Sequence, residues 1–469
     1  MKERQRELKF AITNLMSSLK KLQKIIFYLL IFLIPCNLAK HWPQSWSYVS
    51  GILVDYLIPT LYVTDILIIT LLILWLLEKR TVILSKAKDL KSTRFRNPPF
   101  RRARKFAITI ISIFLLYTLY SILYTKNLSA AFYKLIKIIE FSLLIIYISS
   151  QGRSTFGRKT FIQVLSLSVL WQSVLAIAQW FKQASVFGYW FFGEQPYNAS
   201  TLGIKMINWF GSLRIPSYGT FTHPNVLAGF LVINLIITLN YKLQITNYKK
   251  NSIFNLSNKN LRSYILDLTS LILGTVALFL TFSFASWLVL IIYLLLSLRA
   301  TAKQSPILDC FVLPLSGTPR NDKTKLLIYC VTGLLIFLLI KFIDPESLTR
   351  RFKLTEIAIK MWLSSPLFGV GLNNFIPRME EFGNVVTNYR FLQPVHNVFL
   401  LVLSETGAIG VFSILYLVFR VFSKRKISSF SPSILYTLYS ILFLGLFDHY
   451  FLTLQQGMLL LALTLGFIF

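Results

Sequence analysis

Long runs of apolar residues alternate along this chain with short polar segments. Most of the runs approach the roughly 20 residues that a helix needs to cross the hydrocarbon layer of a bilayer. Because no water reaches that layer, each run is expected to form a helix, which satisfies its own backbone hydrogen bonds. The pattern predicts an all-α polytopic membrane protein with about 12 transmembrane helices. The predicted spans lie near residues 25–39, 57–77, 106–124, 132–149, 161–180, 225–240, 264–282, 286–299, 326–343, 397–419, 432–447 and 451–469.

The composition agrees with this class of protein. Of the 469 residues, 55% are hydrophobic and only 14% are charged, whereas soluble proteins average about 25% charged residues. This balance excludes a soluble enzyme and a disordered protein. The three cysteines are too few and too scattered for a disulfide framework or a metal cluster.

The excess of positive charge is large: 49 Lys and Arg residues stand against 18 Asp and Glu residues. These basic residues concentrate in alternate segments between the apolar runs, so they indicate membrane orientation and not nucleic-acid binding. With the N-terminus in the cytoplasm, the inside segments hold roughly three times as many Lys and Arg residues as the outside segments. We therefore expect a protein of the cytoplasmic (inner) membrane with both termini in the cytoplasm.

The same pattern predicts how the chain is organised. Residues 1–24 are expected to form a basic cytoplasmic tail, and residues 25–469 a single transmembrane domain. Two polar segments without helical or strand periodicity, 79–105 and 300–325, are expected to be flexible cytoplasmic loops that contact anionic lipids. The segment 344–395 is predicted to be a long extracytoplasmic loop containing short amphipathic helices.

All four histidines, namely His41, His223, His396 and His449, fall outside the membrane in this topology, where aromatic residues are also frequent. An interfacial belt explains Trp and Tyr residues at the headgroup level, but it does not explain why histidine is confined to one side. The outer face is therefore where we expect the chemistry.

The segment before the sixth span carries the first candidate residues. Arg214 and His223 could converge on an anionic group beside the start of the following helix, a favourable place for phosphate. The simpler interpretation is a rigid loop before a helix that is capped by Asn225 or Thr222.

The long outer loop contains an amphipathic stretch at about 346–364 that includes Arg350 and Arg351, typical of a helix in the membrane interface. Gly369 and Gly371 follow it. A structural turn explains these two glycines better than a nucleotide-binding loop, which would need a strand before it and a helix after it.

A histidine and a buried acid mark the end of that loop. His396 stands where the chain enters the tenth span, and Glu405 lies nine residues further on. An ionisable group inside a membrane is a functional candidate by default. Glu405 is expected to pair with another helix, with Gly407 and Gly410 allowing a close approach.

The fourth span also carries charged residues. Lys137 and Glu140 are spaced to pair on one helix face, and Lys134 lies on the same span. For these residues a structural role or contact with lipid headgroups is favoured over catalysis.

Three motifs, taken in order, resemble the O-antigen ligase and O-antigen polymerase family of bacterial envelope glycosyltransferases. They are the run Arg214 to Asn225 with Gly219-Thr220-Phe221, the run Ser365 to Phe375, and the run His396-Asn397 to Gly410 with Glu405-Thr406-Gly407. The span count and the long outer loop are similar as well. One position departs from the family, because Phe284 stands where an arginine after the seventh span is expected.

The resemblance implies transfer of a glycan from a polyprenyl-diphosphate-linked donor to an acceptor hydroxyl, with inversion at the anomeric carbon. It implies His396 as the general base or as a group that orients the acceptor, roles suited to imidazole. Since no Asp-x-Asp motif occurs and outer carboxylates are sparse, we expect no cofactor and no metal, with arginines neutralising the diphosphate instead. The expected diphosphate-binding residues are Arg214 and Arg390, with Arg350 or Arg351 in support. Acceptor or leaving-group orientation is assigned to His223, Asn225 and Asn397, and accessory roles to Glu405, Asp448 and His449.

Several alternatives stay open. A polymerase, a ligase acting on lipid A core and a protein O-glycosyltransferase share this donor chemistry and differ in whether a glycan, lipid or protein is the acceptor. A multi-pass transporter or flippase of lipid-linked saccharides would also need many helices, but it predicts broken helices and charged residues along a path through the bilayer. The expected partners are the lipid-linked glycan, its acceptor and membrane lipids.

Overall fold

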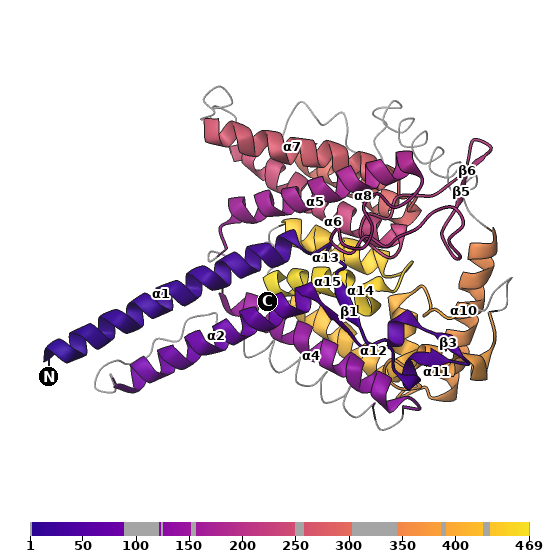
Figure 1. The fold of residues 1–469 in the computed structure, drawn as a ribbon, viewed down its shortest axis with the longest axis horizontal. Coiled ribbons are helices and arrows are strands. Elements are labelled where there is room, and N and C mark those ends of the chain that lie inside the picture. The colour runs from indigo at the N-terminus through magenta and orange to yellow at the C-terminus, as the bar shows by residue number, and fades with distance from the viewer. Residues whose placement is uncertain are drawn as a thin grey trace, which may run out of the picture.

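Helices form most of the protein, whose computed structural model describes residues 2–88, 122, 125–151, 156–248, 258–302, 345–385, 391–424 and 432–468. Figure 1 shows them as a bundle from which α1 and α2 project at one end. The helices are α1 (Lys2–Phe32), α2 (Val63–Lys88), α4 (Leu128–Gln151), α5 (Arg158–Lys182), α6 (Pro224–Tyr248), α7 (Asn258–Phe279), α8 (Phe284–Ala302), α10 (Pro345–Ser364), α11 (Phe375–Phe382), α12 (Val398–Lys424), α13 (Pro432–Leu444), α14 (Tyr450–Thr453) and α15 (Gln455–Ile468).

Four helices of the described residues are long and apolar enough to cross a membrane, which supports a membrane protein. They are Arg158–Lys182, Pro224–Lys242, Leu261–Phe279 and Val398–Tyr416. Shorter apolar helices are Phe284–Leu295, Leu435–Leu444 and Gln455–Phe467. The count of about 12 spans stays a prediction, because the predicted span 326–343 and nearly all of 106–124 lie outside the described residues.

Two helices extend beyond the predicted spans. Residues 2–24, predicted as a separate tail, are helical and continuous with the first span in α1. Helix α2 continues to Lys88, ten residues into the segment 79–105 that was expected to lack helix. The rest of that segment, and residues 303–325 of the second predicted loop, lie outside the described residues.

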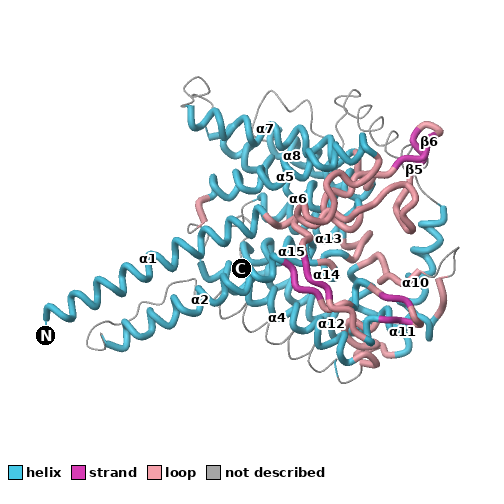
Figure 2. Tube along the Cα trace, viewed as in Figure 1, coloured by secondary structure: helices cyan, strands magenta, loops and turns pink. Residues whose placement is uncertain are grey.

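The described residues are mostly helical, as the sequence predicted, and they also contain a few short strands. The described residues contain three antiparallel sheets of two strands each, drawn in magenta in Figure 2. The sheets at 48–53 and 207–214 lie at the end of the molecule away from the N-terminus, where α10 and α11 also lie, and the sheet of 39–41 with 60–62 lies closer to the middle. They escaped the hydropathy analysis because each strand has only two or three residues. The pairs are β1 (Ala39–His41) with β4 (Thr60–Tyr62), β2 (Tyr48–Val49) with β3 (Ile52–Leu53), and β5 (Ile207–Trp209) with β6 (Ser212–Arg214). The 3-10 turns η1 (Ser45–Ser47) and η2 (Asp55–Leu57) complete this end.

Helix α6 forms the centre of the bundle. Its residues from Val226 to Ile233 are almost all buried, and it packs against α7, α13, α8 and α5. A helix that is apolar all round its circumference belongs in such a position, because every face of it contacts protein. The packing of α6 therefore fixes the position of residues 223–225, at the N-terminal end of this helix.

Helix α12 is broken at Gly407, whose φ of 64° and ψ of −168° are not helical. The freed backbone groups bond to the preceding loop: Val370 N donates to Ser404 O at 2.8 Å, and Ala408 N donates to Pro366 O at 2.9 Å. The Gly369–Gly371 turn therefore docks onto the break in α12. This is how non-helical backbone is tolerated within an apolar segment, because neighbouring protein supplies the missing partners.

Candidate functional site

A cavity of about 800 Å³ opens between α4, α12, α13, α15 and the segments around β3 and β4. All four histidines line it, together with Asp448, Glu405, Lys134 and Lys137. Further along the same helices its wall becomes apolar, with Phe141, Ile145, Val411, Ile414, Leu415, Leu438, Ile441, Leu442, Leu461, Ala462 and Leu465. The cavity is therefore amphipathic, with a polar part near the strands and an apolar part among the helices.

Asp448 organises the polar part. Its Oδ1 lies 3.5 Å from His396 Nδ1 and accepts a hydrogen bond from the backbone N–H of His449 at 2.8 Å. Its Oδ2 accepts a hydrogen bond from Asn225 Nδ2 at 3.0 Å. Asn225, at the start of α6, thus holds the carboxylate that faces His396. Because Nδ1 of His396 is directed at Asp448, Nε2 is the ring nitrogen that remains for another partner.

The carboxylate is kept ionised by its neighbours. Burial opposes ionisation, but the neighbouring imidazole of His396 and the charge of Arg351 outweigh it and hold the pKa of Asp448 well below its usual value. An ionised carboxylate beside an imidazole fixes the ring orientation and stabilises its protonated form. Asp448, predicted only as an accessory residue, therefore lies at the centre of the cluster.

Two other histidines are held neutral. Burial lowers the pKa of His223 to about 3, with Lys205 adding to the effect, and burial also lowers the pKa of His449 to about 3. His223 Nδ1 accepts a hydrogen bond from the backbone N–H of Asn225 at 3.1 Å, which requires that nitrogen to be unprotonated. His449 Nδ1 pairs with Thr453 Oγ1 at 2.7 Å.

These pKa values predict an acid-sensitive fold. Between pH 6.5 and 3 the unfolded chain binds protons at His223 and His449 that the folded chain does not, so stability falls as the pH drops below 6.5. At pH 5 the loss is about 2 kcal/mol per histidine. We expect thermal unfolding in detergent to show this loss, and His449→Asn to remove about half of it. Parallel stability curves for the two proteins between pH 7.5 and 5 would contradict this assignment.

The predicted arginines do not all reach this cavity. Arg214 ends strand β6, is half-buried, and is not among the residues that line it. Arg390 lies outside the described residues. Arg350 contacts Glu346 at 3.3 Å, and its guanidinium stacks on the Phe391 ring at 5.2 Å.

Arg351 lies close to the cluster. Its Nη1 donates to Phe447 O at 2.6 Å, which ties α10 to the residue before Asp448. With His396, Asn397, Phe352 and Leu446 it also lines a second, smaller cavity of about 290 Å³. His396 therefore stands in the wall between two cavities.

Asn397 has a structural role in α12. Its Oδ1 accepts a hydrogen bond from Leu400 N at 3.0 Å, which caps the helix start, and its Nδ2 donates to Leu446 O at 3.1 Å. Its predicted role in orienting the acceptor stays a prediction. Phe284, at the position where the family suggests an arginine, begins α8 and packs edge-on against Trp287, with ring centroids 5.2 Å apart.

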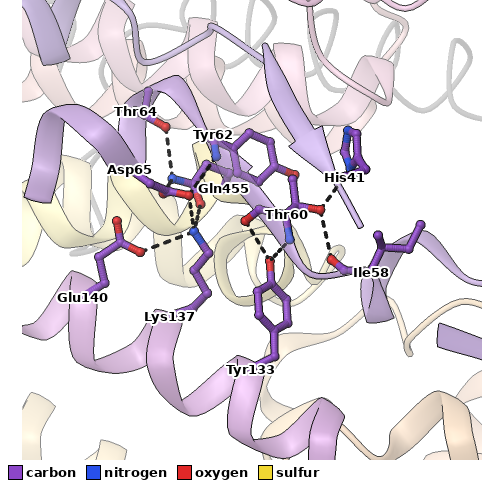
Figure 3. A network of polar contacts seen from close by, with 10 residues as sticks. All are labelled: His41, Ile58, Thr60, Tyr62, Thr64, Asp65, Tyr133, Lys137, Glu140 and Gln455. Atoms are coloured by element: carbon purple, nitrogen blue, oxygen red, sulfur yellow. Dashed lines mark hydrogen bonds and ion pairs between the residues drawn. The ribbon is translucent and has the colours of Figure 1, made fainter. Parts of the chain in front are cut away.

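Figure 3 shows a second polar network, which includes Lys137 and other residues that line the cavity. Lys137 of α4 forms ion pairs with Asp65 of α2 and with Glu140, the latter at 3.3 Å as the sequence spacing predicted. Gln455, at the start of α15, donates to Asp65 and to Thr64 Oγ1. Sequence analysis missed Asp65 and Gln455 as partners of Lys137, although a lone acid at the start of an apolar helix was a visible signal.

Breaking this buried network is expected to destabilise the fold. Lys137→Met leaves Asp65 with an unpaired buried charge, a change that typically costs about 3–5 kcal/mol. Thermal unfolding of the purified protein measures the effect. Lys360→Met is the matched control, because Lys360 pairs with Glu356 at an exposed surface, where little change is expected. Equal unfolding temperatures for the two variants would contradict a structural role for Lys137.

The cluster could also be considered as a metal site. Possible ligand atoms of His396, Asp448 and His449 lie within 4.8 Å of one another. However, both oxygens of Asp448 already accept hydrogen bonds from the chain, and Nδ1 of His449 is paired with Thr453. The arrangement therefore fits a carboxylate that orients imidazole better than a set of ligands directed at an ion.

A comparison with protein families matches residues 269–415 to the family described as O-antigen ligase. This stretch includes the Gly369–Gly371 turn, His396 and the break at Gly407, so the resemblance stated from those motifs is confirmed. A family of this kind indicates glycan transfer in the cell envelope by a membrane enzyme. No curated protein matches the chain.

Proposed function

Because residues 269–415 match the family described as O-antigen ligase, we propose that the protein transfers a glycan from a polyprenyl-diphosphate-linked donor to an acceptor hydroxyl. The reaction takes place at the outer face of the cytoplasmic membrane. The observation that carries this proposal is the pairing of His396 with Asp448 at the polar end of an amphipathic cavity. A lipid-linked sugar diphosphate has the same division into an apolar chain and a polar head.

His396 is the general base of the proposed reaction. Its Nε2 takes the proton of the acceptor hydroxyl, while Asp448 holds the ring through Nδ1 and stabilises the imidazolium that forms. The acceptor oxygen then forms a bond to the anomeric carbon. The bond from that carbon to the diphosphate oxygen breaks with its electron pair, so polyprenyl diphosphate leaves and the configuration inverts.

The two cavities beside His396 suggest how the substrates are arranged. The larger cavity has the apolar wall that a polyprenyl chain needs, so the donor occupies it. The smaller cavity, lined by Arg351 and Asn397, gives the acceptor access to His396 from the other side. Attack from the side opposite the leaving group is the geometry that inversion requires.

Metal independence is part of the proposal. Fixed positive charges from the chain stabilise the leaving diphosphate in place of a divalent ion. We expect the purified protein to keep its activity in EDTA, measured as glycan transferred per minute. Loss of activity in EDTA that magnesium restores would contradict metal independence.

The test of the function is complementation of a strain that lacks the activity. His396→Ala, at an expression level equal to that of the wild type, should abolish glycan attachment, and the gel pattern identifies the reaction. Single units still attached without long glycan indicate a polymerase, whereas full-length glycan that accumulates on its lipid carrier indicates a ligase. Normal glycan in the variant would refute the proposal.

A transporter or flippase remains the second candidate, because two of its features occur. Helix α12 is broken at Gly407, and the last span is broken between α14 and α15 at Leu454. Charged residues also line the cavity between these breaks. Purified protein in liposomes separates the two functions: the transferase forms a new glycosidic bond, whereas a flippase moves intact donor across the bilayer.

A further inference from the structure

Lys134 occupies the boundary between the two parts of the large cavity. It lies six residues into α4, about 9 Å from the start of that helix. Glu405 lies at a similar depth, seven residues into α12. Beyond Lys134 on the same helix come Phe141 and Ile145 of the apolar wall.

The partners of Lys134 come from the two broken helices. Its ammonium donates a hydrogen bond to Leu452 O in α14, and it lies 3.8 Å from Met458 Sδ in α15. It is also close enough to Glu405, two residues before the break in α12, for their charges to interact. The same ammonium acts electrostatically on His449 in the histidine cluster. Lys134 therefore faces both the polar cluster and the apolar wall.

Lys134 differs from the other cations near the cavity. Lys137 already forms ion pairs with two carboxylates, those of Asp65 and Glu140. Arg214 does not line the cavity, and Arg351 lines only the smaller one. Within the described residues, Lys134 is thus the lysine of the large cavity that has no ion pair at salt-bridge distance.

We propose that Lys134 is a binding residue for the diphosphate of a polyprenyl diphosphate whose lipid chain lies in the apolar part of the large cavity. This deepens the proposed function, on which it rests for the nature of the donor. The ammonium keeps its bond to Leu452 O and turns its remaining donors to a phosphate oxygen. Glu405 weakens this contact when it is ionised, because its negative charge interacts with the positive charge of Lys134 and repels the phosphate.

The experiment measures binding of polyprenyl diphosphate, without a sugar, to the full-length protein in detergent. Lys134→Met should weaken binding at least tenfold, whereas Lys134→Arg, which keeps the charge, should stay within about threefold of the wild type. Glu405→Gln should tighten binding several-fold, because the amide keeps an acceptor for Phe375 N but no longer carries a negative charge that repels the phosphate. Polyprenyl monophosphate should bind more weakly than the diphosphate and should lose less affinity in Lys134→Met.

The Glu405 variant separates a phosphate contact from a structural role. If Lys134 and Glu405 only stabilise each other, both Lys134→Met and Glu405→Gln lower the unfolding temperature and neither changes the affinity selectively. Wild-type affinity in folded Lys134→Met, or weaker binding in Glu405→Gln, overturns the proposal. If the wild type binds the lipid through Lys134 but transfers no glycan from a complete donor, the proposed function fails and the binding site stands. If the wild type binds no polyprenyl diphosphate, both fail.

Discussion

His396→Ala is expected to lower the rate of glycan transfer by about 10²–10⁴-fold, the usual contribution of a positioned general base. The side chain lines both cavities, and its Nδ1 is directed at the ionised carboxylate of Asp448. Affinity for polyprenyl diphosphate should change little, because the base acts on the acceptor hydroxyl. The measurement is transfer to a defined acceptor in detergent, with lipid binding determined on the same preparation.

Asp448→Asn is the companion variant, and it tests positioning. The amide keeps the shape of the side chain and can still accept a bond from His449 N, but it no longer stabilises a positive charge on His396. We expect the rate to fall by about 10–10³-fold, with the acid limb of the pH–rate profile moved to lower pH. A lower rate without that movement would show that Asp448 serves the fold and does not tune the base.

Gly407→Ala is expected to prevent α12 from docking on the 366–371 loop, and so to abolish activity by disrupting the fold. A Cβ at this position would lie 2.3 Å from both the carbonyl carbon and the carbonyl oxygen of Leu367, which are backbone atoms that cannot move aside. The φ of 64° and ψ of −168° are also open almost only to glycine. Thermal unfolding and the yield of monodisperse protein measure the effect.

Gly211→Ala is the matched control. Gly211, in the turn between β5 and β6, also has a positive φ of 89°, but a Cβ there would meet nothing within 4 Å. Its substitution costs the backbone strain alone, so the protein should fold with a small loss of stability. Equal behaviour of the two variants would mean that the close approach at Gly407 does not matter.

Hydropathy and motif spacing predicted the membrane class, the family and several local features. The amphipathic stretch at 346–364 is helix α10, and Lys137 pairs with Glu140. The close approach expected at Gly407 occurs, although to the backbone of a loop and not to another helix. These features depend on residues close together in the sequence, or on the length of an apolar run.

The centre of the candidate site could not be predicted in this way. Asp448 faces His396 because the end of α13 and the start of α12 are brought together, with Val398 N donating to Gly445 O at 2.7 Å. Lys134 meets α14 and α15 across more than 300 residues of chain. No periodicity in the sequence encodes such contacts, since they arise from helix packing. Arg214, expected to bind the diphosphate, does not line the cavity, whereas Lys134 of α4 does.

The dependence of α12 on an earlier loop has a consequence for synthesis. Residues 366–371 leave the ribosome before residues 404–409. The loop that bonds to the broken part of α12 is therefore already synthesised when that part of the helix emerges. Until the two meet, the amide and carbonyl groups around Gly407 have no partner within their own helix. A variant in which residues 366–371 are deleted should therefore be retained by the insertion machinery or degraded, even though every apolar segment after this loop is intact.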